Sequence, residues 1–456
     1  MLKNTKGDTK MEKLPPKPKK PRGASREELL KLSKEKLVDL VLQLEAHNGQ
    51  LKNVISKKES DRAEEAIQPN KNKKKFDFST MHTRPVLLHI SYFGWDYNGF
   101  VVQEDTINTI EHHLFNALTR TCLIESRETS DYHRCGRTDK GVSAFGQVIS
   151  ISLRSKHSPE EQSLPESLRT ELDYCKVLNG VLPDNIRVIG WMPVTKGFSA
   201  RFDCKKRQYK YYFPRSSLNI DAMRDSCAML VGSHDFRNLC KMDVGNGVIE
   251  FTREILKADI VAVDSNDTSQ PTSMYSLLIE GNAFLWHQIR CIQAILLLVG
   301  SSCESRDIVT KLLDCESNNR KPQYNMAIDV PLNLFKCSYE VNSDWIYDEN
   351  NLSKLIRHIQ GEWTIQNIKA TMLKDCLQSL EDTYSKLIDE KNTEGKNNGD
   401  NGKIVAYHDC LTEGTKPKNY KPLMKRPTCS TLEEKMAHYT KRRKQYASDE
   451  STAVME

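Results

Sequence analysis

The chain has 456 residues, of which 38% are hydrophobic and 28% charged, and its formal net charge is +6. This length fits two ordinary domains, or one large domain with appendages. No apolar run approaches the roughly 20 residues that span a bilayer, and the first residues are polar and Lys-rich, so we expect neither a membrane partner nor a secretory signal.

Positive charge is concentrated at the two ends of the chain. Residues 1–75 hold 20 Lys and Arg against 11 Asp and Glu, and residues 415–444 hold 10 against 2, whereas residues 76–414 carry a net charge of −8. Basic arms suit a polyanion partner, which they bind with release of counterions. They also occur as solvated or nuclear-targeting segments, and both interpretations stay open at this point.

The first predicted element is a helix in a basic arm over residues 1–75. Prolines exclude a helix over residues 14–22, and Ser25 with Glu28 has the spacing of a capping box. Leucines then recur every seven residues, which predicts either a short coiled coil or an amphipathic helix lying on the body of the protein. These leucines are Leu30, Leu37, Leu44 and Leu51.

Strands and helices alternate from residue 76 to residue 340, which predicts an α+β fold. The run at 148–153 alternates in polarity and predicts a strand with one buried face. We expect loops or insertions at 156–167, 264–273 and 391–403. The other predicted strands are 86–92, 209–213 and 258–263, and the predicted helices are 109–118 and 283–299.

Two further regions follow this body. Residues 341–390 are predicted to form a helical extension, and residues 391–456 a largely disordered basic tail. The 13 cysteines are odd in number and show no C-x-x-C spacing. We therefore expect reduced thiols, with no disulfide framework and no metal site.

The segment densest in chemically useful residues is HRCGRTDKGVSA at 133–144. Gly136 and Gly141 bracket a turn ahead of the predicted strand at 148–153, so Asp139 is well placed to present a carboxylate to a cleft. The same spacing also suits a structural aspartate in an Asx-turn. Taken alone, the loop leaves both roles open.

Five motifs in order resemble the TruA family of tRNA pseudouridine synthases, in which the loop aspartate is the nucleophile. They extend from about residue 76 to residue 336. The family-like runs are YFGWDYNGF at 92–100 with Gln103, RTDKGV at 137–142, FSARF at 198–202 with RQYKY at 207–211, GSHDF at 232–236, and FLWHQIR at 284–290.

A finer resemblance is to the eukaryotic branch that modifies uridines at positions 38 and 39 of the tRNA anticodon stem-loop. It rests on the runs KKFDFS at 74–79, RNLCKMD at 237–243 and YKPLM at 420–424. The resemblance implies two ferredoxin-like halves, with a boundary near 195–215, that form a central mixed or antiparallel sheet with a catalytic cleft. It also implies an N-terminal helical arm, a homodimer and tRNA as partner.

The resemblance assigns roles to three residues. Asp139 is the expected nucleophile, and Arg290 is its expected ion-pair partner, because a buried carboxylate needs a cation to stay ionised. Tyr209 is expected to stack on the uracil and to handle protons. From the residues alone, Arg290 also fits a surface arginine of an amphipathic helix, and Tyr209 a core aromatic residue of a strand.

The remaining site predictions concern RNA and cofactors. Arg137 resembles the residue that helps to turn the base out of the stem-loop, and His133, Arg134 and Lys140 are predicted to contact RNA, although the first two also fit bracing of the loop. His287, and His234 with Asp235, are expected to make structural hydrogen bonds. Isomerisation exchanges no electrons, so neither a cofactor nor a metal is expected.

Two alternatives to this function remain, and one is a related synthase that acts on further tRNA positions or on mRNA. The other is an RNA-binding protein that kept the fold without the activity. The basic runs at 71–75 and 441–444 are compatible with nuclear import as well as with RNA binding, so the expected location is the nucleus, the cytoplasm or both.

Overall fold

The computed structural model describes residues 76–263, 268–341, 343–393, 406–414 and 419–440, with only the backbone of 391–393. The chain divides into two compact units, Met1–Lys73 and Lys74–Glu456, and every described residue belongs to the second. The predicted N-terminal helix and the basic runs at 71–75 and 441–444 lie outside the described residues.

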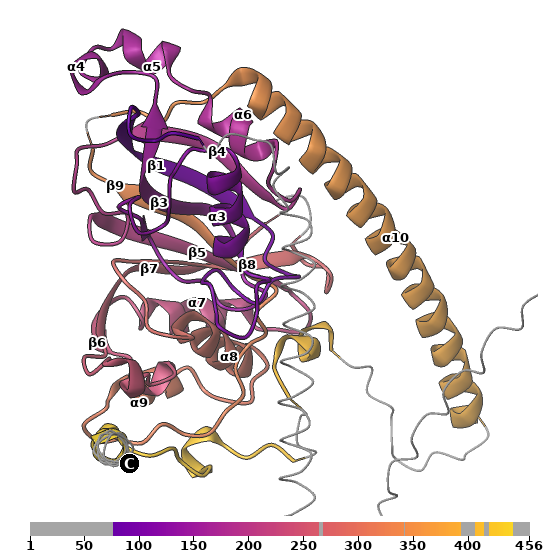
Figure 1. The fold of residues 1–456 in the computed structure, drawn as a ribbon. Helices are drawn as coiled ribbons and strands as arrows, with labels where there is room; N and C mark the ends of the chain where they lie inside the picture. The colour runs from indigo at the N-terminus through magenta and orange to yellow at the C-terminus, as the bar shows by residue number, and fades with distance from the viewer. Residues whose placement is uncertain (1–75, 264–267, 342, 394–405, 415–418, 441–456) are drawn as a thin grey trace, which may run out of the picture. The chain divides into compact units, whose positions relative to one another are not determined.

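A mixed sheet of nine strands forms the centre of the described body (Figure 1). Eight strands run in the order β4-β1-β3-β9-β5-β8-β7-β6, and β2 pairs with β3. The strands are β1 (His82–Tyr92), β2 (His133–Arg134), β3 (Ser143–Ser155), β4 (Ile186–Pro193), β5 (Cys204–Pro214), β6 (Gly232–Asp235), β7 (Thr252–Ala262), β8 (Met274–Gly281) and β9 (Leu332–Tyr339).

The sheet contains two groups of strands that meet at β3 and β9. All neighbouring strands pair antiparallel except these two, which pair parallel over Ser143↔Asn333 and Ala144↔Leu334. Since β3 begins directly after the Asp139 loop, this loop lies where the two groups join. The sheet therefore places the candidate nucleophile between strands from both parts of the chain.

Burial of β3 differs from the prediction. The alternation at 148–153 predicted one buried face, but the strand is buried on both faces, with only Phe145 and Arg154 partly exposed. The reason is that the segments containing Asp131 and Ala200 cover the face that carries Ser150 and Ser152. Serines fit such a strand where they find partners: the Ser150 hydroxyl accepts a hydrogen bond from the Ala200 N–H (3.0 Å), and Ser152 donates to Asp131 (3.1 Å).

The apolar helix predicted at 283–299 begins later than expected. It is α8 (Gln288–Gly300), and it is buried along almost its whole length, packed against α7. His287 precedes it in a left-handed backbone conformation with φ 58°. A β-carbon makes this conformation unfavourable in a helix, so residues 282–287 form a loop that carries side chains to the site described below.

The other helices cover parts of the sheet and its connections. The insertion expected at 156–167 contains α4, which is started by a Ser158–Glu161 capping box that the sequence analysis overlooked. The helices are α3 (Ile110–Arg120), α4 (Pro159–Gln162), α5 (Glu166–Thr170), α6 (Tyr174–Asn179), α7 (Ile220–Ala228), α9 (Ile308–Leu313) and α10 (Glu349–Thr393). Short 3₁₀ turns lie at Arg237–Leu239, Val244–Asn246, Tyr407–Leu411 and Leu423–Lys425.

Parts of the region predicted as a largely disordered tail over 391–456 are among the described residues. Residues 406–414 and 419–440 are described, and they bury Leu411, Leu423 and Leu432. The Ile328 N–H donates to the Leu411 carbonyl (2.9 Å), so this segment packs beside the residues that lead into β9. Apolar residues spaced widely within a basic sequence gave too weak a pattern to predict this contact.

Within the described ranges, every helix is too short or too polar to cross a lipid bilayer.

Candidate active site

The Asp139 loop is held by the segment that follows β1. The Phe100 N–H donates to the Thr138 carbonyl (3.1 Å), and the Gly141 N–H donates to the Tyr97 carbonyl (3.2 Å). The Thr138 hydroxyl also shares a hydrogen bond with the hydroxyl of buried Tyr92 (2.7 Å). The backbone on both sides of Asp139 is therefore fixed to a strand end, as a precisely placed catalytic group requires.

Two glycines make this close approach possible. Gly99 has φ 101°, and a β-carbon there would lie 3.0 Å from the Thr138 carbonyl oxygen. Gly141 has φ 76°, and a β-carbon there would lie 2.8 Å from Cγ of Asp329. Any larger residue would meet backbone strain at these positions, and its β-carbon would lie very close to these neighbours.

The Asp139 carboxylate contacts the loop between β8 and α8. Its Oδ2 lies 3.4 Å from Nε2 of His287, and the Trp286 side chain hydrogen-bonds to it. The Asp139 side chain is 29% exposed, so it is partly shielded yet open to a ligand. Its described contacts thus differ from those of an Asx-turn, in which the carboxylate would bind the backbone of its own loop.

Burial and the groups around Asp139 shift the pKa of its carboxyl in opposite directions. Burial raises the pKa of the Asp139 carboxyl above its usual range, against the effects of Arg290, the Trp286 hydrogen bond and Lys241, while Asp329 raises it further. Burial, Arg290 and Lys241 lower the pKa of His287 to about 4. At neutral pH His287 is therefore an uncharged neighbour of Asp139, and Arg290 and Lys241 supply the positive charge.

Arg290 lies in the first turn of α8 and is almost fully buried. Its Nε donates to the Ala327 carbonyl (2.8 Å), and its guanidinium forms an ion pair with Glu413. It interacts with Asp139 through its charge, whereas its direct carboxylate partner among the described residues is Glu413. Glu413 lies in the predicted tail, outside every motif, so nothing in the sequence indicated this partner.

Tyr209 lies on β5, buried against Phe284, with the two rings edge to face at 5.3 Å. Burial raises the pKa of its hydroxyl well above the usual range, so Tyr209 stays protonated at neutral pH. Phe284, Trp286 and His287 belong to one loop, which therefore touches both Tyr209 and Asp139. The described contacts of Tyr209 do not include Asp139 itself.

Trp286 and Lys241 are further residues of the site, and neither was predicted from the sequence. Nζ of Lys241 lies 4.2 Å from the centre of the Trp286 ring, and the Lys241 N–H donates to the Trp286 carbonyl (2.9 Å). Trp286 stands inside the FLWHQIR motif, so its position was a usable signal. Lys241 lies 45 residues earlier, and only the folded chain brings it to this loop.

The residues predicted to contact RNA fall into two groups. Arg137, Lys140 and His133 are exposed. Arg134 instead donates to Glu111 (2.9 Å), a fully buried carboxylate that also binds Arg127 and the Tyr132 hydroxyl. The bracing role considered for Arg134 is therefore present in the structure.

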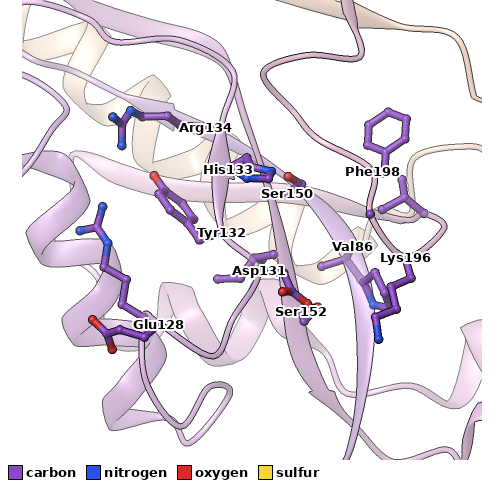
Figure 2. Close-up of a pocket in the computed structure, with 15 residues that line it drawn as sticks. Val86, Glu128, Asp131, Tyr132, His133, Arg134, Ser150, Ser152, Lys196 and Phe198 are labelled. Carbon is purple, nitrogen blue, oxygen red and sulfur yellow. Dashed lines mark hydrogen bonds between the residues drawn. The ribbon is translucent and has the colours of Figure 1, made fainter. Parts of the chain in front are cut away.

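A surface hollow of about 530 Å³ lies beside β2 and β3 (Figure 2). His133, Arg134 and Lys196 are among its lining residues, together with Glu128 and Asp131. Asp139, Tyr209 and Arg290 do not line it. It is thus separate from the carboxylate site, and its lining carries charges of both signs.

Comparison with known proteins identifies the class to which this site belongs. A sequence model described as tRNA pseudouridine synthase matches residues 227–340, which include Arg290 and His287. The tRNA pseudouridine(38/39) synthase of Homo sapiens is 44% identical over 423 residues, covering 90% of this chain and 88% of the human protein. The protein of that name in Saccharomyces cerevisiae is 39% identical, over 69% of this chain and 72% of the yeast protein.

A more distant relative is similar over a smaller share of this chain. The tRNA pseudouridine synthase A of Methanosarcina acetivorans is 28% identical, over 60% of this chain and 94% of the archaeal protein. The chain belongs to the TruA family of tRNA pseudouridine synthases. It is an isomerase, as members of this family are.

Proposed function

We propose that this enzyme converts uridine to pseudouridine at positions 38 and 39 of the tRNA anticodon stem-loop. The similarity to proteins named for these two positions extends over most of both chains and supports this specificity. The observation that carries the chemistry is the partly buried Asp139 carboxylate, held between two glycines and flanked by cations.

Asp139 is the proposed nucleophile. The reaction breaks the N1–C1′ bond of uridine, turns the base and joins C5 to C1′, with no net gain or loss of atoms. In one route an Asp139 oxygen bonds to C1′ while N1 leaves with the bonding electrons; C5 then attacks C1′ and releases the carboxylate. The proton on C5 is removed and N1 gains a proton, so the product is an isomer. In the other route Asp139 removes the C2′ proton as N1 leaves with the bonding electrons; C5 then adds to C1′ of the resulting sugar alkene, and Asp139 returns the proton to C2′.

Arg290 and Lys241 are proposed to keep Asp139 ionised as RNA covers the site. Binding of a base excludes water, which raises the cost of a charged carboxylate. The positive charge of Arg290, together with the hydrogen bond from Trp286, opposes this effect. His287 is neutral at the working pH and adds a second polar contact to the carboxylate.

Tyr209 is proposed to stack on the turned-out uracil, with its hydroxyl protonated. Arg137, His133 and Lys140 are proposed to contact the RNA backbone or to replace the extruded base, and their exposure supports this role. Arg134 is proposed to support RNA binding mainly by bracing the loop, through its ion pair with Glu111.

The larger organisation is also a proposal. We propose two ferredoxin-like halves, supported by the strand orders β4-β1-β3-β2 and β9-β5-β8-β7, each with helices between its strands. The proposed domains are a basic arm at 1–75, this body at 76–340, the helical extension at 341–390 and the C-terminal region at 391–456. A homodimer acting in the nucleus, the cytoplasm or both completes the proposal.

The direct test of substrate and position is incubation of the purified enzyme with unmodified tRNA, followed by mapping of the pseudouridines formed. We expect product at uridines 38 and 39. Modification at other tRNA positions or in mRNA would mean a broader synthase, and binding without any product would mean an RNA-binding protein that has lost the activity.

A further inference from the structure

We propose that Cys135, Cys204 and Cys337 together bind a thiophilic metal ion, for which zinc is the best candidate. Their three sulfur atoms all lie within 4.8 Å of one another. Each residue is at least nine-tenths buried, with 3%, 8% and 9% exposed. It is the one cluster of this kind among the residues that the structure describes.

The three cysteines come from different parts of the sheet. Cys135 directly follows β2, and its N–H donates to the Val148 carbonyl of β3 (2.8 Å). Cys204 begins β5, and Cys337 lies on β9, the strand paired with β5. Because β3, β9 and β5 are neighbours in the sheet, their backbone hydrogen bonds bring the three sulfur atoms close together even without a metal.

The spacing fits a zinc ion after a small contraction. Zinc–sulfur bonds of ~2.3 Å in a tetrahedral site put sulfur atoms roughly 3.8 Å apart, so each pair has to close by about 1 Å at most. Three cysteines leave the fourth position for water or another small ligand. Cys204 now donates weakly to the Lys206 carbonyl (3.4 Å) and would lose this proton on binding.

A cation beside the cluster balances the charge. Three thiolates and one zinc ion carry a net charge of −1, which is costly to bury without a partner. Arg207 lies opposite Cys337 on β5, and its guanidinium donates to the Cys135 carbonyl (3.1 Å) and to the Arg201 carbonyl (2.9 Å). Its positive charge offsets that of the metal–thiolate group.

Such a metal would be structural, and it would help to hold the residues of the active site in place. Cys135 stands four residues before Asp139, and Cys204 five residues before Tyr209. A metal at this cluster would link the segment leading to the nucleophile directly to β5 and β9. It would therefore add a bond between the two groups of strands close to the reacting residues.

The first experiment measures metal content. The full chain is purified without a metal-affinity tag, dialysed against a weak chelator and analysed by mass spectrometry for metals. We expect about one zinc ion per chain, which is lost in Cys204→Ser and in Cys337→Ser. The matched control is Cys227→Ser, a buried cysteine of α7 outside the cluster, which should keep its zinc.

The second experiment needs no variant and covers the case in which a serine variant fails to fold. Metal-free wild-type protein is titrated with Co²⁺, and its absorption is recorded. We expect the ultraviolet charge-transfer band of thiolate-bound cobalt, and we expect added Zn²⁺ to abolish this band and to raise the melting temperature. A wild-type protein that gives no such band, or whose isolated form contains a disulfide between two of these cysteines, would overturn the proposal.

Discussion

At the scale of single residues, the environment of Asp139 sets the pH range in which the enzyme can work. The raised pKa of its carboxyl means that the ionised form is lost as the pH falls, at a higher pH than for an ordinary aspartate. We expect the single-turnover rate to fall on the acidic side with unit slope, at a midpoint above the usual aspartate range. A rate that stays constant down to that usual range would contradict this account.

Substitutions of Arg290 and of Glu413 should shift this midpoint in opposite directions. Arg290→Gln removes a positive charge near Asp139, so the midpoint should rise. Glu413→Gln removes the carboxylate that forms an ion pair with Arg290. More of the positive charge of Arg290 then acts on Asp139, so the midpoint should fall. Rate–pH profiles of the two variants test the pair, and equal shifts in the same direction would show that Arg290 acts on Asp139 by other means.

Gly141 provides a test of how tightly the loop is held. Gly141→Ala places a β-carbon on a residue with φ 76°, 2.8 Å from Asp329, and should cost about 1–2 kcal/mol of stability from backbone strain alone. Gly136→Ala is the matched control, because a β-carbon there would have no neighbour within 4 Å. Chemical unfolding of both variants gives the comparison, and equal stability would argue against the strain.

At the scale of secondary-structure elements, the loop between β8 and α8 joins the parts of the site. It brings Trp286 and His287 into contact with Asp139, and Phe284 into contact with Tyr209. Helix α8 begins directly after this loop and carries Arg290. Helical periodicity over 283–299 extended the predicted helix through this loop. The left-handed backbone at His287 explains why the helix starts at Gln288 instead.

Trp286 should contribute to catalysis through its hydrogen bond rather than through packing. Trp286→Phe keeps a large aromatic ring but removes the N–H donor, so the pKa of Asp139 should rise. The acidic limb of the rate should shift accordingly, with little change in tRNA affinity. Trp363→Phe, at an exposed position of α10, is the control and should leave both unchanged.

The limits of prediction from sequence also appear at this scale. Asp139 and Arg290 were found through contiguous motifs, and the folded chain brings them into one electrostatic environment. Glu413, Lys241 and the three clustered cysteines belong to no common motif, since the cysteines are separated by 69 and 133 residues. Their proximity depends on strand order and on packing of the C-terminal region, which local periodicity does not encode.

At the scale of the whole molecule, charge is divided between a net acidic body and basic ends. Removal of residues 1–75 should therefore weaken tRNA binding and reduce its dependence on salt, because fewer counterions are released. The rate at saturating tRNA should be unchanged, since every described residue of the active site belongs to the second compact unit. Binding isotherms at several salt concentrations test this, and an unchanged salt slope would refute the proposed role of the arm.

The central claim is that the Asp139 carboxylate reacts with the substrate, and single-turnover pseudouridine formation by Asp139→Ala and Asp139→Asn tests it most directly. The control is Asp105→Ala, at an exposed position outside the loop. We predict that both Asp139 variants bind tRNA as the wild type does and form no pseudouridine, whereas the control stays active. Measurable turnover by either Asp139 variant would contradict the account.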